Sequence, residues 1–314
     1  MKDLLRTEHL SRADVEMILA TAADFAKNPF REKHELANKT VAIYMTKPST
    51  RTRLASETAT AHLGGTPIFI RGDELQLGRG ETIADTARII SGFCSALVIR
   101  TFAQADVDEL GKWATIPVIN ALTDDDHPTQ LLADWLTIRE NFGENIAGRK
   151  FVYLGDGNNM ANTWLIMGAI MGAHVVAATP SGKWAPSLEA IATAKKIAAH
   201  SGATVEVTDD PETAAKGASV LYTDVWMSMG DPESERNEKS KVLAPFSVTE
   251  HLMSLTSSDS IFMHCLPAHR GEEVAASVID GTRSVIWREA FHRRTTIQSL
   301  LYHLIRGEIQ GVSH

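Results

Sequence analysis

The sequence has few cysteines, no long apolar run and no surplus of positive charge, and each of these absences excludes a class of protein. The 314 residues include only two cysteines, Cys94 and Cys265, which is too few for a disulfide framework or a Cys-rich zinc module. No stretch approaches the roughly 20 apolar residues of a membrane helix, and residues 1–6 lack the apolar core of a signal peptide. Lys and Arg number 31 against 39 Asp and Glu, and the net charge of −8 disfavours nucleic acid or an anionic membrane as a partner.

What the chain does contain is typical of a globular enzyme. Hydrophobic residues make up 44% of it and charged residues 22%, and its length suits two domains of roughly 150 residues each. We therefore expect a cytoplasmic enzyme that acts on small molecules, with no nucleic-acid partner and no membrane attachment.

Short β-rich runs alternate with helical stretches along the whole chain. In the first half, strands are predicted at 40–45, 66–70, 96–99 and 117–121, and helices after Ser11 and over 50–62, 83–91, 107–113 and 128–140. In the second half, strands are predicted at 150–154, 174–178, 204–207, 220–223, 261–264 and 285–287, and helices over 159–171 and 187–199. This alternation predicts an α/β fold of two doubly wound parallel-sheet domains, with a hinge near 139–148.

A final helix presents one apolar face, formed by Ile297, Leu300, Leu301, Leu304 and Ile305. Their spacing means that the helix packs on one of the domains, but the pattern does not say on which.

The first candidate site is the segment Ser49-Thr50-Arg51-Thr52-Arg53, between a predicted strand and a helix N-terminus. Free backbone N–H groups and the helix dipole favour an anion there, and guanidinium groups match the geometry of phosphate. The alternative is an ordinary helix cap with solvated arginines. Because the segment lacks the glycines and the Gly-Lys pair of a nucleotide-binding P-loop, a small phosphorylated metabolite is favoured over ATP.

Two further groups follow neighbouring strands of the first domain. His127-Pro128-Thr129-Gln130 places a histidine and an amide about one helical turn apart, and Arg100 ends the strand at 96–99. A lone histidine is more often structural than functional. Ligands of open α/β sheets, however, bind at the carboxyl ends of strands, where all these residues converge.

The second domain repeats this arrangement with different chemistry. Gly155-Asp156-Gly157-Asn158-Asn159 resembles half of a dinucleotide fingerprint, but Met160 stands where a third glycine belongs and Thr179 ends the next strand in place of an acidic residue. Both departures argue against NAD and leave an amide-rich turn that suits a polar ligand.

Two polar groups end later strands of that domain. Asp224 is either a turn cap or a carboxylate for an amino group. His264-Cys265-Leu266-Pro267 ends another strand, and a zinc site from His264, Cys265 and His269 is disfavoured because no clustered Cys or His pair completes it. Cys94, with no polar neighbour in sequence, is predicted to be a core residue.

Together these motifs resemble the aspartate/ornithine carbamoyltransferase family, and within it the members that use ornithine. The resemblance rests on the Ser49–Arg53 and His127–Gln130 segments, on Asp224-Val225-Trp226-Met227-Ser228-Met229-Gly230, and on His264–Pro267, in this order along the whole chain. It implies transfer of the carbamoyl group from carbamoyl phosphate to the side-chain amine of L-ornithine, giving L-citrulline and phosphate, with arginine biosynthesis favoured over catabolism. It also implies a homotrimer or a multiple of trimers, and no cofactor or metal.

The resemblance further implies a domain for each substrate. Residues 1–140, with the C-terminal helix 290–314 packed back on them, would bind carbamoyl phosphate, and residues 141–289 would bind ornithine. The expected carbamoyl-phosphate residues are Ser49, Thr50, Arg51, Thr52, Gln76, Arg100, His127, Gln130, Cys265, Leu266 and Arg293. The expected ornithine residues are Asn159, Asp224, Ser228 and Met229, and the expected catalytic residues are Arg51, His127, Asp224 and Cys265.

Several points stay open at the level of sequence. Asp224, Cys265 and the phosphate itself are all candidates for the proton that the amine loses. The chain departs from the family pattern at Ala55, Ser56 and His292, the last of which replaces a usual asparagine. Residues 228–241, rich in charge, are expected to form a mobile lid. The alternatives are a carbamoyltransferase for another amine, a catalytically silent member of the family and, more distantly, an NAD-dependent dehydrogenase.

Overall fold

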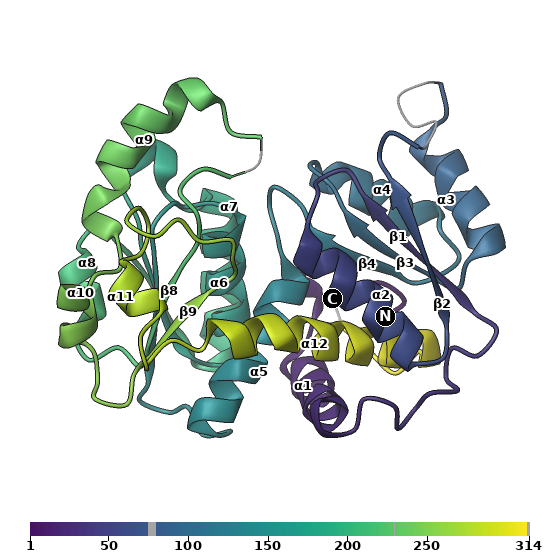
Figure 1. Ribbon diagram of the computed structural model, residues 1–314, viewed down its shortest axis with the longest axis horizontal. Helices are drawn as coiled ribbons and strands as arrows, with labels where there is room; N and C mark the ends of the chain where they lie inside the picture. Colours follow the sequence, from purple (N-terminus) through teal and green to yellow (C-terminus); the bar gives the residue numbers. More distant parts are fainter. Residues whose placement is uncertain (75–79, 229, 313–314) are drawn as a thin grey trace. The chain divides into compact units, whose positions relative to one another are not determined.

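The computed structural model describes residues 1–74, 80–228 and 230–312. The chain divides into two compact units, the first formed by Met1–Leu136 with Phe291–His314 and the second by Thr137–Ala290. The chain passes from one unit to the other within helix α5 (Pro128–Phe142) and returns within helix α12 (Ile286–Arg306). Figure 1 traces this course from purple to yellow. None of the helices in the described part of the chain combines the length and the apolar character that a membrane span needs.

The first unit is built on a four-stranded parallel sheet with the strand order β2-β1-β3-β4. Its strands are β1 (Thr40–Met45), β2 (Thr66–Arg71), β3 (Ala96–Arg100) and β4 (Val118–Leu122). Its other elements are η1 (Thr7–His9), α1 (Arg12–Lys27), α2 (Thr50–His62), α3 (Ile83–Phe93), α4 (Gln104–Trp113) and the first part of α5. Ser11 caps α1 in a reciprocal capping box with Asp14, as its sequence predicts.

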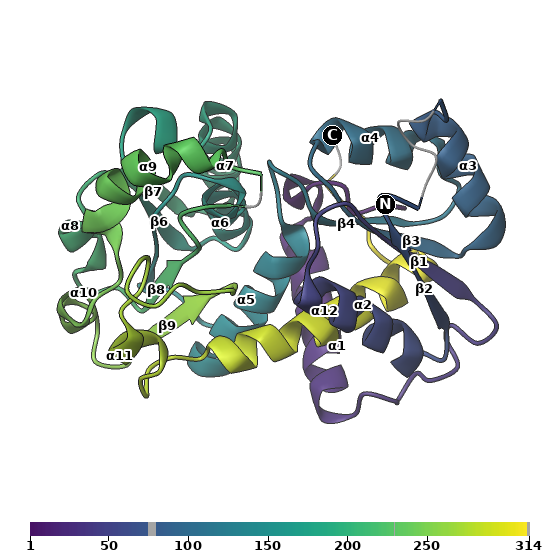
Figure 2. The same cartoon turned by 45° about the horizontal axis from the view of Figure 1, so that its top comes forward.

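Helices cover both faces of this sheet. Alternate side chains of β1 and β3, such as Tyr44 and Leu97, pack with Ile90 of α3 and Val107 of α4 into one apolar cluster. On the other side of the sheet α12 lies beside α1 and α2 in both views (Figures 1 and 2). The Ser299 hydroxyl there donates to the Ile18 carbonyl over 2.8 Å. The C-terminal helix therefore packs on the first unit, as expected from the resemblance.

The second unit is built on a five-stranded parallel sheet with the order β7-β6-β5-β8-β9. Its strands are β5 (Lys150–Leu154), β6 (His174–Ala178), β7 (Thr204–Thr208), β8 (Val220–Thr223) and β9 (Ile261–His264). Its helices are α6 (Asn159–Ile170), η2 (Gly182–Trp184), α7 (Leu188–Ser201), α8 (Pro211–Ala215), η3 (Glu233–Glu235), α9 (Arg236–Leu243), η4 (Ala244–Phe246), α10 (Glu250–Leu255) and α11 (Ala276–Ile279).

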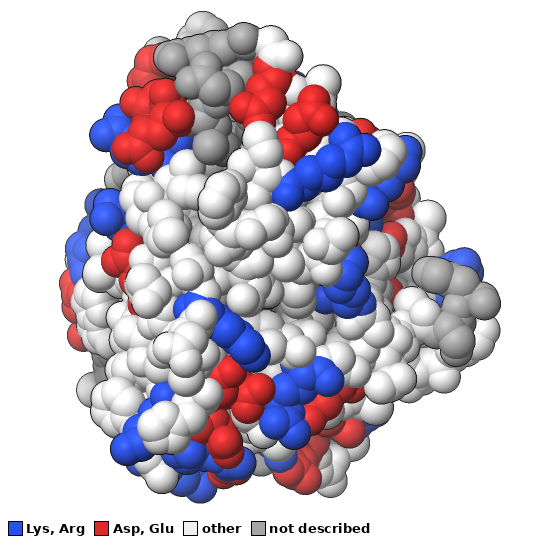
Figure 3. Space-filling model, turned by 90° about the vertical axis from the view of Figure 1, so that its right-hand side faces the viewer, with Lys and Arg blue, Asp and Glu red and all other residues white. Residues whose placement is uncertain are grey.

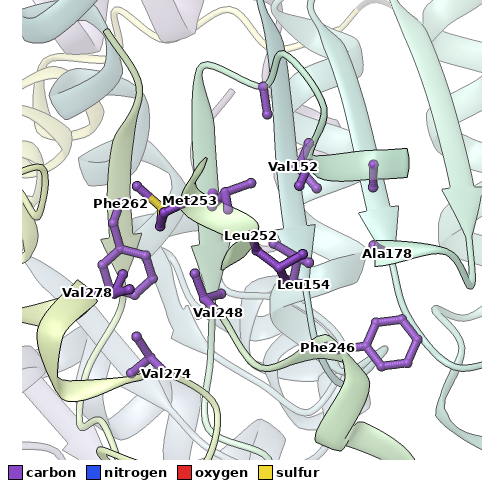
Figure 4. Close-up of a cluster of buried hydrophobic side chains, with 14 of the residues drawn as sticks. Val152, Leu154, Ala178, Phe246, Val248, Leu252, Met253, Phe262, Val274 and Val278 are labelled. Carbon is purple, nitrogen blue, oxygen red and sulfur yellow. The ribbon is translucent and has the colours of Figure 1, made fainter. Parts of the chain in front are cut away.

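This second sheet is also covered on both faces. Figure 4 shows the cluster in which Val152 and Leu154 of β5 meet Leu252 of α10 and Val278 of α11. Tyr222 of β8 packs on the other face against Trp164 of the almost entirely buried helix α6, with ring centroids 4.9 Å apart. The predicted fold class, two doubly wound parallel sheets, is confirmed.

The sequence-based prediction of a strand at residues 285–287 is wrong. An isolated bridge pairs Ser284 with Phe262 just before this run, the Val285 N–H donates to the Phe262 carbonyl over 3.1 Å, and α12 then begins at Ile286. The Glu289 carboxylate in the first turn accepts the His264 N–H over 2.9 Å, which fixes the helix start beside β9. A run of three apolar residues does not distinguish a strand from the first turn of a helix.

Part of the segment expected to form a mobile lid, residues 228–241, is helical, because α9 begins at Arg236.

The strand orders predict where ligands bind in each sheet. In the first unit the strand order switches sides between β1 and β3, which are parallel neighbours, and in the second unit it does so between β5 and β8. Open parallel sheets bind ligands at the carboxyl ends of the strands at such a switch point, because the following connections diverge there. The segments after β1 and β3, and those after β5 and β8, are the ones that carry the sequence motifs.

Two glycines shape the turn after β5, and the backbone alone explains both of them without a bound dinucleotide. Gly155 has φ +132°, which side-chain-bearing residues rarely adopt. At Gly157 an added Cβ would lie 2.1 Å from the Ala185 carbonyl carbon, because the Gly157 N–H donates to the Trp184 carbonyl over 2.8 Å. The partial fingerprint thus reflects close packing of the backbone.

Replacing Gly157 by alanine is therefore expected to lower the free energy of unfolding by about 2–3 kcal/mol, the typical cost of forcing extra volume into a packed site. Urea denaturation measures the change. The matched control is Gly92→Ala in α3, where an added Cβ meets nothing within 4 Å and the helix gains propensity. Equal urea midpoints for the two variants would contradict the packing argument.

Candidate active site

Four cations surround one buried histidine in the first unit. Lys47 follows β1, Arg51 is the second residue of α2, Arg100 ends β3 and Arg293 lies on α12. Burial of the imidazole lowers the pKa of His127, and all four cations lower it further, so that it lies well below the usual 6.5. The ring is therefore neutral at pH 7, and a neutral ring offers one N–H donor. We call Lys47, Arg51, Arg100, His127 and Arg293 the cationic cluster.

The N-terminus of α2 contributes backbone donors to the same region. Ser49 is its N-cap, with extended backbone and a side chain that accepts the Thr52 N–H over 3.2 Å. Thr50 and Arg51 form the first turn, which contains no acidic residue. The positive end of the dipole is thus left to attract an anion.

Arg293 is the most deeply buried of these cations. Its guanidinium, 2% exposed, donates to the Gln130 side-chain oxygen, to the Thr129 hydroxyl over 3.4 Å and to the Thr52 hydroxyl over 3.3 Å. Gln130 in turn donates to Asp134 over 2.8 Å. The structure therefore brings together residues from α2, α5 and α12 that the sequence analysis placed in one site. All three departures from the family pattern, Ala55, Ser56 and His292, are buried.

Lys47 is a residue that sequence reasoning missed. Its side chain is buried, forms an ion pair with Asp124 and lies over the Phe102 ring, with Nζ 4.4 Å from the centroid. The sequence did offer a signal for Lys47 as a site residue, namely its position just after β1 and two residues before Ser49. Arg53, by contrast, points elsewhere: it pairs with Glu57 over 3.0 Å and stacks on Phe69.

A carboxylate cluster lies at the corresponding edge of the second sheet. Asp224, 7% exposed, follows β8 and accepts the Cys265 thiol over 2.9 Å and the Val225 N–H over 2.8 Å through the same oxygen. Its other oxygen accepts the Asn158 amide over 3.0 Å. Asn158 also caps α6. These hydrogen bonds fix the carboxylate and the thiol side by side, one after β8 and one after β9.

Asp156, in the turn after β5, was not singled out as a site residue by the sequence analysis. Burial raises its pKa to about 6, and the neighbouring Asp231 and Asp224 raise it as well, while Lys239 opposes the shift. Lys239 forms ion pairs of 2.7 Å with both Asp156 and Asp231. No local pattern links these three residues, which come from separate segments.

The remaining expected residues are placed as follows. Asn159 is the first residue of α6, and the Ser228 N–H donates to Asp231 over 3.0 Å. Leu266 has a positive φ of 60°, and its N–H donates to the His264 ring over 2.8 Å. Gln76 and Met229 lie outside the described residues. Cys94, predicted to be a core residue, packs partly buried against the apolar cluster of the first unit.

The two candidate zinc ligands His264 and Cys265 contact different partners. The His264 ring is 3.3 Å from Glu273, whereas Cys265 donates to Asp224. His269, Glu272 and Glu273 bring possible ligand atoms within 4.8 Å of one another, and this set contains neither His264 nor Cys265. The geometry therefore does not assemble the zinc set that the sequence analysis considered.

Comparison with known proteins gives matches over nearly the whole chain. The family models described as the carbamoyl-P binding domain and the Asp/Orn binding domain of aspartate/ornithine carbamoyltransferase match residues 2–140 and 147–304. The chain is 47% identical over 306 residues to "Ornithine carbamoyltransferase" of Anoxybacillus flavithermus, covering 97% of this chain and 96% of that one.

Two further relatives carry more specific names. "Ornithine carbamoyltransferase, anabolic" of Pyrococcus furiosus is 45% identical, with 98% of each chain covered, and the ornithine carbamoyltransferase structure from that organism superposes with a TM-score of 0.92 over 98% of both chains. "Ornithine carbamoyltransferase, catabolic" of Thermoplasma volcanium is 44% identical and covers 93% of this chain and 95% of its own.

A cationic cluster and a carboxylate–thiol cluster lie at the switch points of the two sheets, and the matching family models and relatives define the protein as a group-transfer enzyme, a transferase. The chain belongs to the aspartate/ornithine carbamoyltransferase family, as the resemblance of its motifs indicates.

Proposed function

We propose that this enzyme transfers the carbamoyl group of carbamoyl phosphate to the side-chain amine of L-ornithine, forming L-citrulline and phosphate. The observation that carries the choice of ornithine is the hydrogen bond of 2.9 Å between the Cys265 thiol and Asp224. Asp224 begins the segment that ends in Ser228-Met229-Gly230. A buried carboxylate with hydrogen-bond donors on both oxygens is suited to a cationic amine. The names of the relatives support the same substrate.

In this proposal each unit binds one substrate. Residues 1–140 with 290–314 bind carbamoyl phosphate, through Ser49, Thr50, Arg51, Thr52, Gln76, Arg100, His127, Gln130 and Arg293. Residues 141–289 bind ornithine through Asn159, Asp224, Ser228 and Met229, and Cys265 and Leu266 act at the reacting carbon. The charges of Lys47, Arg51, Arg100 and Arg293 around His127 support a phosphate ligand, since a cluster of cations attracts an anion.

The chemistry needs one new bond and one broken bond. The ornithine ammonium loses one proton, and the resulting amine attacks the carbamoyl carbon. As the tetrahedral intermediate collapses, the nitrogen loses a second proton to the departing phosphate, and the C–O bond to phosphate breaks with the electron pair leaving on phosphate. The first proton goes to Asp224, to Cys265 or to the phosphate. Arg51, Arg100 and neutral His127 stabilise the charge that develops on the carbonyl and phosphate oxygens, which is commonly the largest catalytic contribution.

The test is an assay of the purified protein with carbamoyl phosphate and a panel of amines. We expect equal amounts of phosphate and citrulline with ornithine, and far slower turnover with putrescine or aspartate. Activity with another amine but not with ornithine would replace the substrate, and binding of carbamoyl phosphate without turnover of any amine would indicate a catalytically silent member of the family.

We further propose a role in arginine biosynthesis, although relatives carry both the anabolic and the catabolic name. Deletion of the gene in its host distinguishes the two roles. A requirement for arginine supports biosynthesis, whereas growth without arginine together with loss of arginine breakdown supports catabolism.

We propose in addition that the enzyme is located in the cytoplasm, which cell fractionation tests.

We also propose a homotrimer or a multiple of trimers. The end of the first unit that carries β2 and α3 exposes large apolar side chains, among them Ile68, Ile89 and Phe93, the last 80% exposed. Figure 3 shows this end of the unit as a broad area of uncharged residues with a few Lys and Arg within it and with Asp and Glu toward its margins. Such a patch is typical of an interface. Light scattering of the purified protein tests the mass, and a monomer would refute the assembly.

A further inference from the structure

Lys239 is a buried lysine that has no role in the carbamoyl transfer described above. It lies on α9, is 5% exposed, and its ammonium is 2.7 Å from Asp156 Oδ2 and 2.7 Å from Asp231 Oδ2. Lysine is almost never buried without a partner, and removal of one member of a buried ion pair leaves an uncompensated charge. We call Lys239, Asp156 and Asp231 the ion triad. Its three side chains come from separate segments of the second unit.

One carboxylate of the triad holds the segment of Ser228. The Asp231 side chain accepts the Ser228 N–H over 3.0 Å, and the Asp231 N–H donates back to the Ser228 carbonyl over 3.1 Å. These two bonds tie Ser228 to Asp231, and we call this pair the Ser228 turn. The same Asp231 oxygen that accepts the Ser228 N–H also faces Lys239. The position of Ser228 is therefore linked directly to the ammonium of Lys239.

The other carboxylate belongs to the turn that supports Asp224. The Asp156 carbonyl accepts the Tyr153 hydroxyl over 2.8 Å, and that hydroxyl lies 3.3 Å from Asn158 Oδ1. Asn158 donates to Asp224 over 3.0 Å. Lys239 thus joins the Ser228 turn to the turn that orients Asp224.

The charges explain why a cation is needed at this place. Asp156 and Asp231 face each other with one ammonium between them, and Asp224 lies near enough for its charge to raise the pKa of Asp156. Without Lys239 the carboxylates of the two turns would repel each other across a poorly solvated gap. A neutral side chain of similar length fills the space but does not hold the turns together.

We propose that Lys239 is a positioning residue for ornithine: its ammonium draws the Ser228 turn onto the Asp156–Asn158 turn and so fixes Ser228 relative to Asp224. The inference rests on the proposed function, because Ser228 and Asp224 are ornithine residues in it. Lys239 itself acts through Asp231 and Asp156. The affinity for ornithine depends on the triad, whereas the affinity for carbamoyl phosphate, bound by the first unit, does not.

The test is the steady-state kinetics of Lys239→Met and Lys239→Arg. In Lys239→Met the KM for ornithine is expected to rise about 10–100-fold, the scale of effect that a misplaced binding group produces. The KM for carbamoyl phosphate stays within about twofold, because the triad contains no residue of the first unit. Lys239→Arg keeps the charge and at least two donors and returns the KM for ornithine toward the wild-type value. The matched control is Lys195→Met on α7, an exposed lysine of the same unit, which changes neither KM.

A second variant covers the case in which Lys239→Met does not fold. Asp231→Asn removes one ion pair at a partly exposed side chain and keeps an oxygen for the Ser228 N–H, so the KM for ornithine rises in the same direction by a smaller factor. A wild-type ornithine KM in a folded Lys239→Met or Asp231→Asn variant overturns the inference. So does an equal rise of both KM values that Lys239→Arg does not reverse, since that indicates a purely structural role. A wild-type enzyme that forms no citrulline refutes the proposed function and this inference with it.

Discussion

Arg51→Ala is expected to lower kcat/KM for carbamoyl phosphate by about a thousandfold or more, since one preorganised donor to developing charge is commonly worth 10²–10³ and this donor also carries a charge. Arg51 is half-buried at the first turn of α2, where the helix dipole and the Ser49 cap already favour an anion. Its charge acts on His127 together with Lys47 and the other arginines. Steady-state kinetics with carbamoyl phosphate varied at saturating ornithine measures the effect.

Two variants show which property of Arg51 matters. Arg51→Lys keeps the charge but loses the planar fork that matches phosphate, so an intermediate loss is expected. Arg53→Ala, two residues further along the same helix, is the control, because the Arg53 side chain faces Glu57 and Phe69 instead of the cationic cluster. Equal kinetics of Arg51→Ala and Arg53→Ala would remove Arg51 from the site.

Most of the fold follows from patterns of apolar residues that the sequence shows locally. The strands at 40–45, 150–154, 174–178, 220–223 and 261–264 have the predicted bounds, because each is a short apolar run ended by polar residues or glycine. The exceptions are places where tertiary contacts decide. The run at 285–287 becomes the start of α12 because Glu289 bonds the end of β9, and the charged residues of α9 become helical around the buried Lys239.

The site residues that the sequence analysis proposes either lie near the ends of predicted strands or, like Arg293, match a motif of the family. Ser49–Thr52 and His127–Gln130 lie next to the ends of strands, so their convergence follows from the strand order of a parallel sheet. Lys239 and Asp156 could not be predicted, because each has a role only through a partner far away in the chain. The turn at Gly155–Asn159 was predicted as a polar ligand site, and the structure adds that Gly157 is also required for packing.

Asp224→Asn is expected to lower kcat/KM for ornithine by about a thousandfold, because the change removes a charge that a substrate ammonium would otherwise meet in a site that excludes water. The carboxylate already accepts three donors, from Cys265, Val225 and Asn158. An asparagine of the same shape must turn an NH₂ group toward some of these donors, so the variant also loses hydrogen bonds. Kinetics with ornithine varied, and calorimetric titration with carbamoyl phosphate, separate the two substrates.

Asp259→Asn provides the matched control for this change. Asp259 is an exposed acid of the same unit that pairs with Arg149 over 2.9 Å, and its replacement is expected to leave the ornithine kinetics unchanged. Carbamoyl phosphate should bind Asp224→Asn as it binds the wild type, since the cationic cluster belongs entirely to the first unit. If Asp224→Asn weakened both substrates equally, the loss would reflect the fold of the protein. If its ornithine kinetics matched those of Asp259→Asn, Asp224 would have no role in holding the amine, and recognition of ornithine would have to depend on Ser228 and Asn159.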